Sequence, residues 1–588
     1  MGNQEVARLF RDVAAAYVIK DEKKFYFQAL AYQKASETIG ASTTEIKDLY
    51  KEGKLQDMPG IGVTIRSRLE ELFKKGSVAH FKAVLRGIPE SVFVLINVPS
   101  IGPKKAYKLA KKLGLNNPKT VIEDLMLKAK VHEIAKIEGF GEKSEEDIIR
   151  ALLEYQEAKG KITRMVLPYA GEIAEKLLSY LKQSPAVDKA VPLGSLRRMM
   201  STVGDIDIAV ATNKPQEVIE YFVNYPYKDR IIEKGPASAS ILTSGGTQVD
   251  LMVTSPSGFG ALLQHFTGSK NHNVKLREYA LSKGLSLSEH GIKNLTTGKT
   301  SLYPTEEKFY QSLGMEWIPP EIREDTGEIE LAIKHDLPKL VELSDIRGDL
   351  HIHSSFPIEP SHDLGFSDPK EMVEYAGKLN YEYLGFSEHN PSVSKHTPEQ
   401  IYSLIAKRNE HIEQIKSSIK DVRIIKMLEI DILASGDLAV DNRSMELLDG
   451  AIVSIHSSFA TGKKEMTKRV LAGLSHPKAK ILAHPTGRLL NERPGYELDF
   501  DLIFDFCQKH NKALEINCWP ERLDLPDLLI REAVKNNVKL VIDTDSHEVS
   551  QMSLMRYGVE TARRGWATKS DIINALSYSE FTEWLKAR

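Results

Sequence analysis

The stretch that decides the fold is Val191–Asp207, which reads VPLGSLRRMMSTVGDID. It closes with Asp205-Ile206-Asp207, and the apolar run that continues to Val210 has strand character. In a strand, residues i and i+2 lie on one face, so the carboxylates of Asp205 and Asp207 project to the same side. Mg²⁺ is usually held by one or two carboxylates together with substrate phosphates. The stretch therefore predicts a divalent-cation site at the start of a strand.

The beginning of the same stretch suits a phosphate, because the Gly194-Ser195 turn offers backbone N–H groups and Arg197-Arg198 offers charge in fork geometry. A further carboxylate, Asp250, lies inside another strand-like run and is costly to bury unpaired. Three carboxylates on adjacent strands suit two-metal phosphoryl transfer. A surface turn with capping aspartates would explain the D-x-D pair alone, but the combined spacing is much less common.

The spacing G-S-x-R-R…G-D-x-D resembles that of bacterial family X DNA polymerases, which belong to the nucleotidyltransferase superfamily and are related to DNA polymerase beta. The resemblance implies a palm domain that binds two Mg²⁺ ions through the catalytic residues Asp205, Asp207 and Asp250. It also implies contacts to an incoming dNTP from Gly194, Ser195, Arg198 and Gly204.

Composition is ordinary for a soluble multidomain protein, with 588 residues, 41% hydrophobic and 27% charged. The net charge of −2 gives no global basic signal, so any DNA-binding surface must be local. No apolar run approaches the ~20 residues of a membrane helix, and the two cysteines, Cys507 and Cys518, fit a reducing compartment. We expect a cytoplasmic, nucleoid-associated monomer of bacterial type.

Residues 1–158 contain an internal repeat, in which a short turn ending G-h-G, relaxed to S-I-G in the second unit, precedes a helix. Glycine permits the tight turn, and the N–H groups at the helix start form a phosphate site. The pattern resembles the helix–hairpin–helix, which binds DNA backbone; an ordinary packing unit is the alternative for any one copy. The expected DNA-binding residues are Gly60, Gly62, Gly102, Lys104, Lys105, Lys108, Gly139 and Gly141.

Arg68 falls where the first domain of this family often carries a Schiff-base lysine that removes a 5′-deoxyribose phosphate. Arginine stays protonated and is a poor nucleophile. This departure puts lyase activity in doubt, and we expect the domain to grip a 5′ phosphate or the downstream strand.

The run Leu263–Asn273, LQHFTGSKNHN, resembles the nucleotide-selection subdomain of the family, where a Y-F-T-G-S turn lies against the sugar. His265 replaces the tyrosine, which leaves the strength of ribonucleotide exclusion open because imidazole is smaller than phenol. The resemblance implies that Phe266 packs on the sugar, that Asn273 hydrogen-bonds the base and that Arg277 touches the template. Gly268 belongs to the same turn, and a packed turn without a ligand is the alternative.

From residue 346 short apolar runs alternate with helical stretches, which predicts a parallel α/β sheet closing into a barrel. Histidines and carboxylates recur at the ends of these runs, where chemistry lies in such barrels. A single histidine there is most often structural, but H-x-H at His351 and His353 and D-x-H at Asp545 and His547 place ligands on one face. The set suits two or three ions of zinc, manganese or iron acting on a phosphoester.

This half resembles the PHP (polymerase and histidinol phosphatase) domain. The residues that match its metal ligands are His351, His353, His389, Glu429, His456, His484, Asp545 and His547. The family usually has S-D-G after H-x-H, whereas Ser355–Gly365 here looks like an insertion. Asp363 is the best match for the ninth ligand, with Glu359 and His362 as rivals. Arg488 is expected to hold the substrate phosphate.

We therefore expect a multidomain chain of helical, α+β and distorted β/α-barrel parts. The expected parts are a helical domain with one helix–hairpin–helix at 1–85, a helical subdomain with two at 86–158, the palm at 159–255, the nucleotide-selection subdomain at 256–318, a linker at 319–345 and the PHP domain at 346–588. The expected function is a DNA-directed DNA polymerase that fills short gaps in base excision repair, with a PHP 3′–5′ exonuclease that uses Mn²⁺ or Zn²⁺. AP endonuclease, 3′-phosphatase or small-molecule phosphatase activity of the PHP part is the alternative, and for the whole chain a DNA-binding scaffold or a non-templated nucleotidyltransferase.

Overall fold

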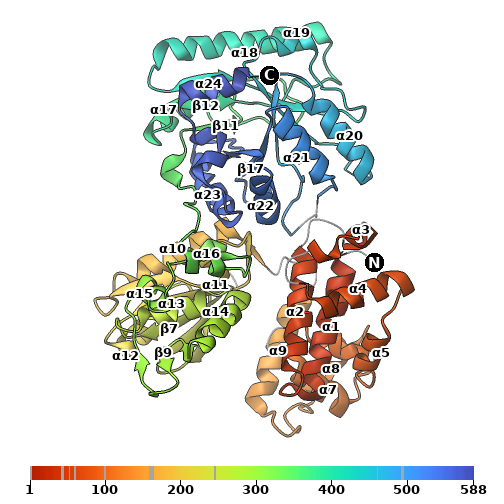
Figure 1. Ribbon diagram of the computed structural model, residues 1–588, viewed down its shortest axis with the longest axis vertical. Helices are drawn as coiled ribbons and strands as arrows, with labels where there is room; N and C mark the ends of the chain where they lie inside the picture. The colour runs from red at the N-terminus through yellow and green to blue at the C-terminus, as the bar shows by residue number, and fades with distance from the viewer. Residues whose placement is uncertain are drawn as a thin grey trace. The chain divides into compact units, whose positions relative to one another are not determined.

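The computed structural model describes residues 3–41, 46–51, 53–57, 61–98, 101–157, 164–243, 247–459, 461–491 and 495–587. The chain divides into two compact units, Met1–Thr163 and Arg164–Arg588 (Figure 1). Among the described residues, no helix combines the length and the apolar content needed to span a bilayer.

The first unit is helical throughout its described residues. Its elements are α1 (Asn3–Asp21), α2 (Tyr26–Ala41), α3 (Ile46–Lys51), η1 (Leu55–Asp57), α4 (Val63–Lys75), α5 (Ala79–Leu85), α6 (Glu90–Leu95), α7 (Pro103–Leu113), α8 (Val121–Lys130) and α9 (Glu142–Glu157). Helices α1 to α5 enclose an aromatic core in which Phe10 contacts Tyr32 and Phe81. Helices α6 to α9 enclose a second, aliphatic core.

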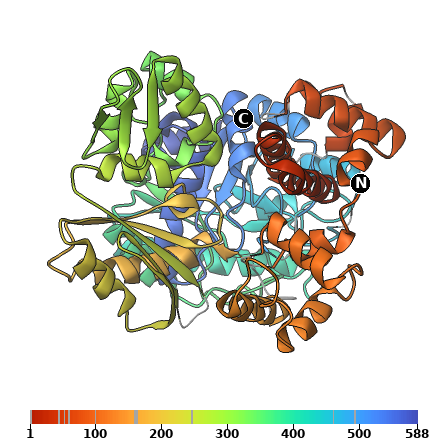
Figure 2. The same cartoon turned by 90° about the horizontal axis from the view of Figure 1, so that it is seen from below.

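The palm begins the second unit with the five-stranded sheet β2-β4-β7-β6-β5 (yellow to olive arrows in Figure 2). Its strands are β2 (Lys189–Pro192), β4 (Ile206–Ala211), β5 (Lys228–Lys234), β6 (Ser238–Thr243) and β7 (Gln248–Thr254). Only β4 and β7 pair in parallel within this sheet. Helices α10 (Leu167–Leu181) and α12 (Pro215–Val223) cover one face and α13 (Phe259–Thr267) covers the other. A small antiparallel pair, β1 (Met165–Val166) with β3 (Thr202–Val203), and the short α11 (Gly194–Arg197) complete the palm.

The subdomain after the palm continues from α13 into α14 (Lys270–Ser282), the antiparallel strands β8 (Leu285–Ser288), β9 (Gly291–Asn294) and β10 (Thr300–Ser301), and α15 (Glu306–Ser312). Residues 319–345, expected to be a linker, instead form η2 (Pro320–Ile322), α16 (Glu328–Lys334) and η3 (Leu343–Asp345), and pack into the same core. Arg323 and Glu328 are fully buried there. Burial is tolerated because Arg323 pairs with Glu306 at 2.6 Å, and because Glu328 lies 2.8 Å from the His272 ring and accepts from the N–H groups of Asp325 and Thr326. The polar composition that suggested a linker therefore marks buried ion pairs.

The C-terminal barrel is built from parallel strands, as predicted. They are β11 (Gly348–Ile352), β12 (Tyr383–Phe386), β13 (Arg423–Lys426), β14 (Glu429–Asp431), β15 (Ala451–Ser454), β16 (Ala479–Leu482), β17 (Ala513–Asn517) and β18 (Lys539–Asp543). Bridges between His389 and Glu429 and between Ile352 and Ser546 join the two sheets at the carboxyl ends of the strands.

Helices surround these strands. They are α17 (Pro369–Lys378), α18 (Pro398–Ser418), α19 (Asn442–Met445), α20 (Lys463–Leu474), α21 (Phe500–Lys509), α22 (Asp527–Lys535), η4 (Val549–Leu554), α23 (Met555–Arg564), η5 (Lys569–Asp571), η6 (Ile573–Ala575) and α24 (Tyr578–Lys586). Phe581 of α24 stacks on Tyr383 and contributes to the inner core of the barrel. Cys507 and Cys518 are buried free thiols.

The palm and the barrel share a hydrophobic core. Tyr557 of α23 and Leu523 of the loop after β17 are buried among palm residues. At the same interface Arg556 pairs with Glu175 at 2.7 Å, and Arg564 donates a hydrogen bond to the carbonyl of Arg198 at 2.6 Å.

Candidate active sites

The palm brings Asp205, Asp207 and Asp250 together. Asp207 of β4 lies directly opposite Asp250 of β7, and Asp205 precedes β4 by one residue. One carboxylate oxygen from each of the three residues lies within 4.8 Å of the other two. The parity of β4 places Asp205 and Asp207 on the face of Ala209 and Ala211, which α13 covers.

The negative charges of these three carboxylates repel one another, and a bound cation would neutralise that repulsion. Burial raises the pKa of Asp207 to about 7, and the charges of Asp205 and Asp250 add to the rise. Oxygen ligands on two adjacent strands, with room for substrate phosphates, fit Mg²⁺. The residues present therefore fit the ions that the sequence implied.

The first residue of α11, Gly194, must be glycine for two reasons. Gly194 has φ +58°, and a Cβ at this position would lie 2.5 Å from Oδ2 of Asp207. The backbone thus approaches the carboxylate so closely that a side chain would displace it. Ser195 follows in the first turn of α11, and Gly204 is exposed on the other side of Asp205.

Of the two arginines in the motif, Arg197 has a structural role. Its guanidinium donates to Glu306 at 2.5 Å and to the hydroxyl of Thr267 at 2.5 Å. Arg198 donates to Glu324 at 3.0 Å and to the carbonyl of Thr267 at 2.5 Å. Glu324 in turn contacts Arg564 of the barrel at 3.2 Å. The Arg198 side chain is therefore half-buried between the palm, the following subdomain and the barrel.

The last turn of α13 presents His265 and Phe266, whose rings meet edge to face at 4.8 Å. Burial lowers the pKa of His265, so its imidazole is neutral at pH 7. Arg277 lies 3.4 Å from the His265 ring. The amide of Asn273 donates to the carbonyl of His265 at 2.7 Å and accepts from Gln264 at 2.7 Å, so Asn273 also holds this turn in place.

Gly268 ends this turn beside Arg198. It has φ +71°, and a Cβ there would lie 3.0 Å from the Nη1 of Arg198.

Two helix–hairpin–helix turns of the first unit have the same geometry. Gly62 before α4 has φ −72° and ψ 168°, and Gly102 before α7 has φ −72° and ψ 169°. A Cβ at either glycine would meet no described atom within 4 Å, so the backbone at each helix start is open to approach. The N–H groups of a helix start are a ready site for a phosphate. Gly60 lies outside the described residues.

The lysines that follow the second turn are partly engaged within the unit. Lys104 pairs with Glu22 at 2.7 Å, and Lys108 donates to the carbonyl of Glu138 in the third turn. Lys105 lies beside Lys104 at the start of α7. In the third turn Gly139 has φ +82°, and Gly141 precedes α9. Arg68 of α4 pairs with Glu71 at 3.6 Å.

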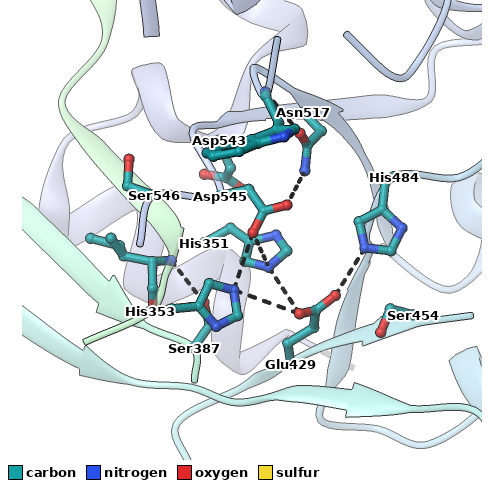
Figure 3. Close-up of polar contacts among 12 residues, drawn as sticks. His351, His353, Ser387, Glu429, Ser454, His484, Asn517, Asp543, Asp545 and Ser546 are labelled. Carbon is teal, nitrogen blue, oxygen red and sulfur yellow. Dashed lines mark hydrogen bonds and ion pairs between the residues drawn. The ribbon is translucent and has the colours of Figure 1, made fainter. Parts of the chain in front are cut away.

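The barrel gathers its predicted ligands at the carboxyl ends of the strands (Figure 3). Nε2 of His353 lies 3.2 Å from Asp545, and Nε2 of His351 lies 3.3 Å from Glu429 and 3.5 Å from Asp545. The other oxygen of Glu429 lies 3.0 Å from His484. Glu429 thus stands between two groups of imidazoles.

His456 joins the second of these groups, with Nε2 3.4 Å from Glu429. Asp363 lies between the two remaining predicted histidines, 3.1 Å from Nε2 of His389 and 3.1 Å from Nε2 of His547. Of its rivals, Glu359 points elsewhere and contacts His396 at 3.3 Å. His362 also lines the cavity and could hold a metal ion with Asp431, at 3.1 Å, and His456.

The barrel site fits metal ions by a test that is independent of its sequence pattern. The nitrogens His351 Nε2, His353 Nε2, His389 Nδ1 and His547 Nε2 are buried and form no hydrogen bond within the described part of the chain. Burial lowers the pKa of His353 and of His484 to about 3, so both imidazoles are neutral, as a metal ligand must be. Against its burial, the charge of Glu429 and the Asp363 carboxylate raise the pKa of His389 to about 10, so a metal ion bound there would replace a proton. Nitrogen and carboxylate donors together suit Zn²⁺ or Mn²⁺. A cavity of about 380 Å³ opens above these ligands.

Three residues that orient the ligands were missed from the sequence. Glu515 of β17 accepts from Nδ1 of His351 at 2.5 Å and from the His484 backbone N–H at 2.5 Å. Asn517 bridges Glu515 and Asp545 at 3.1 and 3.0 Å. Asp431 lies 2.7 Å from Nδ1 of His456. Glu515 and Asn517 could have been found from the sequence, because they are two polar residues at alternate positions of the otherwise apolar strand ALEIN.

Arg488, which was expected to hold the substrate phosphate, is hydrogen-bonded within the barrel, and its phosphate contact stays a prediction. Its guanidinium donates to the carbonyls of Arg522, at 2.9 Å, and Leu523, and therefore braces their loop. Arg522 lines the cavity instead, with Nε 3.9 Å from Asp545. Glu388, next to the ligand His389, is a buried partner of Arg408.

Comparisons with known proteins show which families the chain is similar to. A family model described as DNA polymerase beta thumb matches residues 262–324, a helix-hairpin-helix domain matches 1–78 and a SAM-like helix-hairpin-helix tandem matches 93–153. A probable phosphatase of Syntrophotalea carbinolica is 24% identical over 172 residues, which are 29% of this chain and 64% of the relative. DNA polymerase lambda of Rattus norvegicus is 22% identical over 352 residues, 55% of this chain and 56% of its own. DNA polymerase/3'-5' exonuclease PolX of Bacillus subtilis (strain 168) is 33% identical over 588 residues, 100% of both chains. The chain therefore belongs to the family X DNA polymerases.

Proposed function

We propose that this family X polymerase extends primers across short gaps in DNA at its palm and removes nucleotides from DNA 3′ ends at its barrel. The observation that carries the proposal is the presence of two separate ligand clusters, Asp205–Asp207–Asp250 in the palm and the histidine-rich set in the barrel. The relative in Bacillus subtilis is named for both activities.

In the palm, Asp205 and Asp207 would hold two Mg²⁺ ions and Asp250 the one beside the primer 3′-OH. When bound, the ions stabilise the attacking and leaving oxygens of an in-line displacement at phosphorus. The turn at Gly194-Ser195 presents N–H groups to the triphosphate, and Arg198 supplies a planar cation. Because Arg198 donates a hydrogen bond to Glu324, a triphosphate that binds Arg198 would have to compete with that carboxylate.

Substrate selection in the palm falls to the last turn of α13. Phe266 would pack on the sugar beside His265, while Arg277 would contact the template strand. The N–H groups at Gly62 and Gly102 would grip DNA phosphates without reading sequence. On this proposal, dNTPs and gapped or primed DNA are the substrates, and the enzyme works on the bacterial nucleoid.

In the barrel, three groups of residues would hold Mn²⁺ or Zn²⁺. The groups are His351, His353, Glu429 and Asp545; Glu429, His456 and His484; and Asp363, His389 and His547. When bound, such ions supply hydroxide near neutral pH and neutralise a phosphate. Glu515, Asn517 and Asp431 fix the orientation of the ligands, and Arg522 adds a cation above them.

Product analysis separates exonuclease activity from its rivals. An exonuclease releases deoxynucleoside 5′-monophosphates from a 3′-hydroxyl end, a 3′-phosphatase releases only inorganic phosphate from a 3′-phosphate end, and an AP endonuclease cuts beside an abasic residue. We expect monophosphates as the main product with Mn²⁺, and their loss in His353→Ala. Phosphate release or abasic cutting in the absence of monophosphates would contradict the assignment. For the palm, loss of template-directed insertion in Asp250→Asn is expected, and retained insertion would contradict the role of Asp250.

A further inference from the structure

Two aromatic side chains stand at the rim of the barrel cavity. Phe366 and Trp519 both line the cavity together with Arg522. Both adjoin His547, since Phe366 donates its N–H to the His547 carbonyl at 2.6 Å and the Trp519 ring lies 6.2 Å from the imidazole, edge to face. The site thus has an apolar rim above a floor of metal ligands.

The exposure of Phe366 is not explained by the fold. Phe366 is 78% exposed. Among the described phenylalanines only Phe27 is equally exposed. The backbone around it is fixed, because the next residue, Ser367, accepts from the N–H of Ser355 at 2.9 Å and from the N–H of Val549 at 3.0 Å. An anchored backbone therefore holds the ring in its exposed position, and Phe366 joins none of the hydrophobic clusters that the described residues form.

The cavity is lined by two kinds of side chain, the charged and imidazole groups of the predicted metal ligands and the two aromatic rings. Metal ligands on the floor take a phosphate, and Arg522 adds charge beside Asp545. A phosphate alone requires nothing apolar, whereas aromatic faces next to a phosphate site are the pattern that binds a nucleobase by stacking. An apolar small molecule would gain nothing from the ionic floor.

We propose that Phe366 and Trp519 form a base-stacking subsite that holds the 3′-terminal nucleobase of an unpaired DNA end. The proposal rests on the proposed 3′ nuclease function of the barrel and names the form of its substrate. A base inside a duplex already stacks on its neighbours, so only a frayed, mismatched or single-stranded terminus can place its base on Phe366. Stacking tolerates every base, so this subsite selects unpaired ends without selecting sequence.

The test compares two single-stranded oligonucleotides that differ only in the 3′-terminal residue, which is deoxyadenosine in one and an abasic tetrahydrofuran nucleotide in the other. We measure release of that residue with Mn²⁺ by wild type, Phe366→Ala, Phe366→Trp and Leu502→Ala. Leu502 is a matched control, because it is 53% exposed on α21 and does not line the cavity. Loss of one base stack costs roughly five- to hundred-fold in affinity.

We expect Phe366→Ala to lower kcat/KM on the deoxyadenosine end about five- to hundred-fold and on the abasic end less than about two-fold. Phe366→Trp restores the first value, and Leu502→Ala changes neither. Equal losses on both ends would assign Phe366 to the shape of the metal site and overturn the proposal, as would no loss on either.

A binding measurement keeps this inference separate from the nuclease assignment. An oligonucleotide with 3′-terminal 2-aminopurine is titrated with full-length protein in EDTA, where stacking quenches fluorescence and no hydrolysis occurs. We expect quenching by wild type and Leu502→Ala and much less by Phe366→Ala. Quenching that depends on Phe366 without any 3′ degradation would support the subsite and contradict the nuclease function. Quenching that is unchanged in Phe366→Ala would overturn the subsite even if degradation is normal.

Discussion

Gly194→Ala tests how the palm turn and its carboxylates depend on each other. A Cβ at residue 194 would lie 2.5 Å from Oδ2 of Asp207, whereas ordinary contact begins at 3.4 Å. The carboxylate or the turn must therefore move by about 0.9 Å, the difference between these distances. A misplacement of about 1 Å costs on the order of 10²-fold in rate, or roughly 2.7 kcal/mol of transition-state stabilisation.

The same substitution also strains the backbone, because residue 194 has φ +58°. That strain costs about 1–2 kcal/mol of stability and says nothing about Asp207. Gly284→Ala is the matched control, since Gly284 has φ +69° and its Cβ would meet no described atom within 4 Å. Both variants should lose about the same stability, and only Gly194→Ala should lose insertion.

The assay is single-turnover dNTP insertion on gapped DNA with Mg²⁺, with 3′ degradation by the barrel as an internal check on folding. We expect insertion by Gly194→Ala to fall about 100-fold, insertion by Gly284→Ala to change less than about three-fold, and degradation to persist in both. Insertion by Gly194→Ala within about three-fold of wild type would refute the argument that this glycine exists to admit the Asp207 carboxylate.

The remaining predictions concern the barrel, the pH response and the interface. Glu515→Gln should weaken Mn²⁺ or Zn²⁺ binding at the barrel about 10- to 100-fold, measured by metal titration, because His351 loses the carboxylate that orients it. With the Asp207 pKa at about 7, protons compete with Mg²⁺ below pH 7, so the Mg²⁺ concentration for half-maximal insertion should rise about ten-fold per pH unit from 7 to 6. Arg564→Ala should lower the unfolding free energy by about 3 kcal/mol in urea, because Asp527 and Glu324 lose their buried partner.

Each of these has a control within the chain. Insertion should be normal in Glu515→Gln, and unchanged metal affinity would contradict its orienting role. A Mg²⁺ requirement that does not vary between pH 6 and 7 would show that Asp207 is ionised throughout. Arg556→Ala removes a largely exposed ion pair at the same interface and should cost no more than about 1 kcal/mol. An equal loss of unfolding free energy in Arg564→Ala and Arg556→Ala would contradict the argument that the buried Arg564 contributes more than the exposed Arg556.

Local patterns were sufficient where the chemistry follows the period of a strand. Asp205 and Asp207, and His351 and His353, share a face because side chains alternate in a strand. Asp250 could be recognised because a carboxylate in an apolar run needs a partner. The pairing of Asp207 with Asp250 required only that their two strands be neighbours.

Packing decided what the sequence could not. Arg488 and Arg522 are both arginines near the barrel site, and the sequence does not distinguish their roles. In the structure Arg488, after β16, donates to a carbonyl of the loop after β17, whereas Arg522, in that loop, lines the cavity near Asp545. Residues 319–345 have the polar composition of a linker, but Arg323 and Glu328 are buried because they find partners earlier in the chain, Glu306 and His272. The inserted loop between Ser355 and Gly365 offered three acidic or histidine candidates, and only the folded loop shows Asp363 between His389 and His547 and His362 beside Asp431.

The central claim is that one chain carries two independent metal-dependent sites. The most direct measurement follows one labelled primer on gapped DNA with Mn²⁺, with and without dNTPs, in Asp207→Ala and His353→Ala. The account predicts that Asp207→Ala loses extension and keeps 3′ degradation, and that His353→Ala loses degradation and keeps extension. Loss of both activities in either variant, or extension by Asp207→Ala, would contradict it.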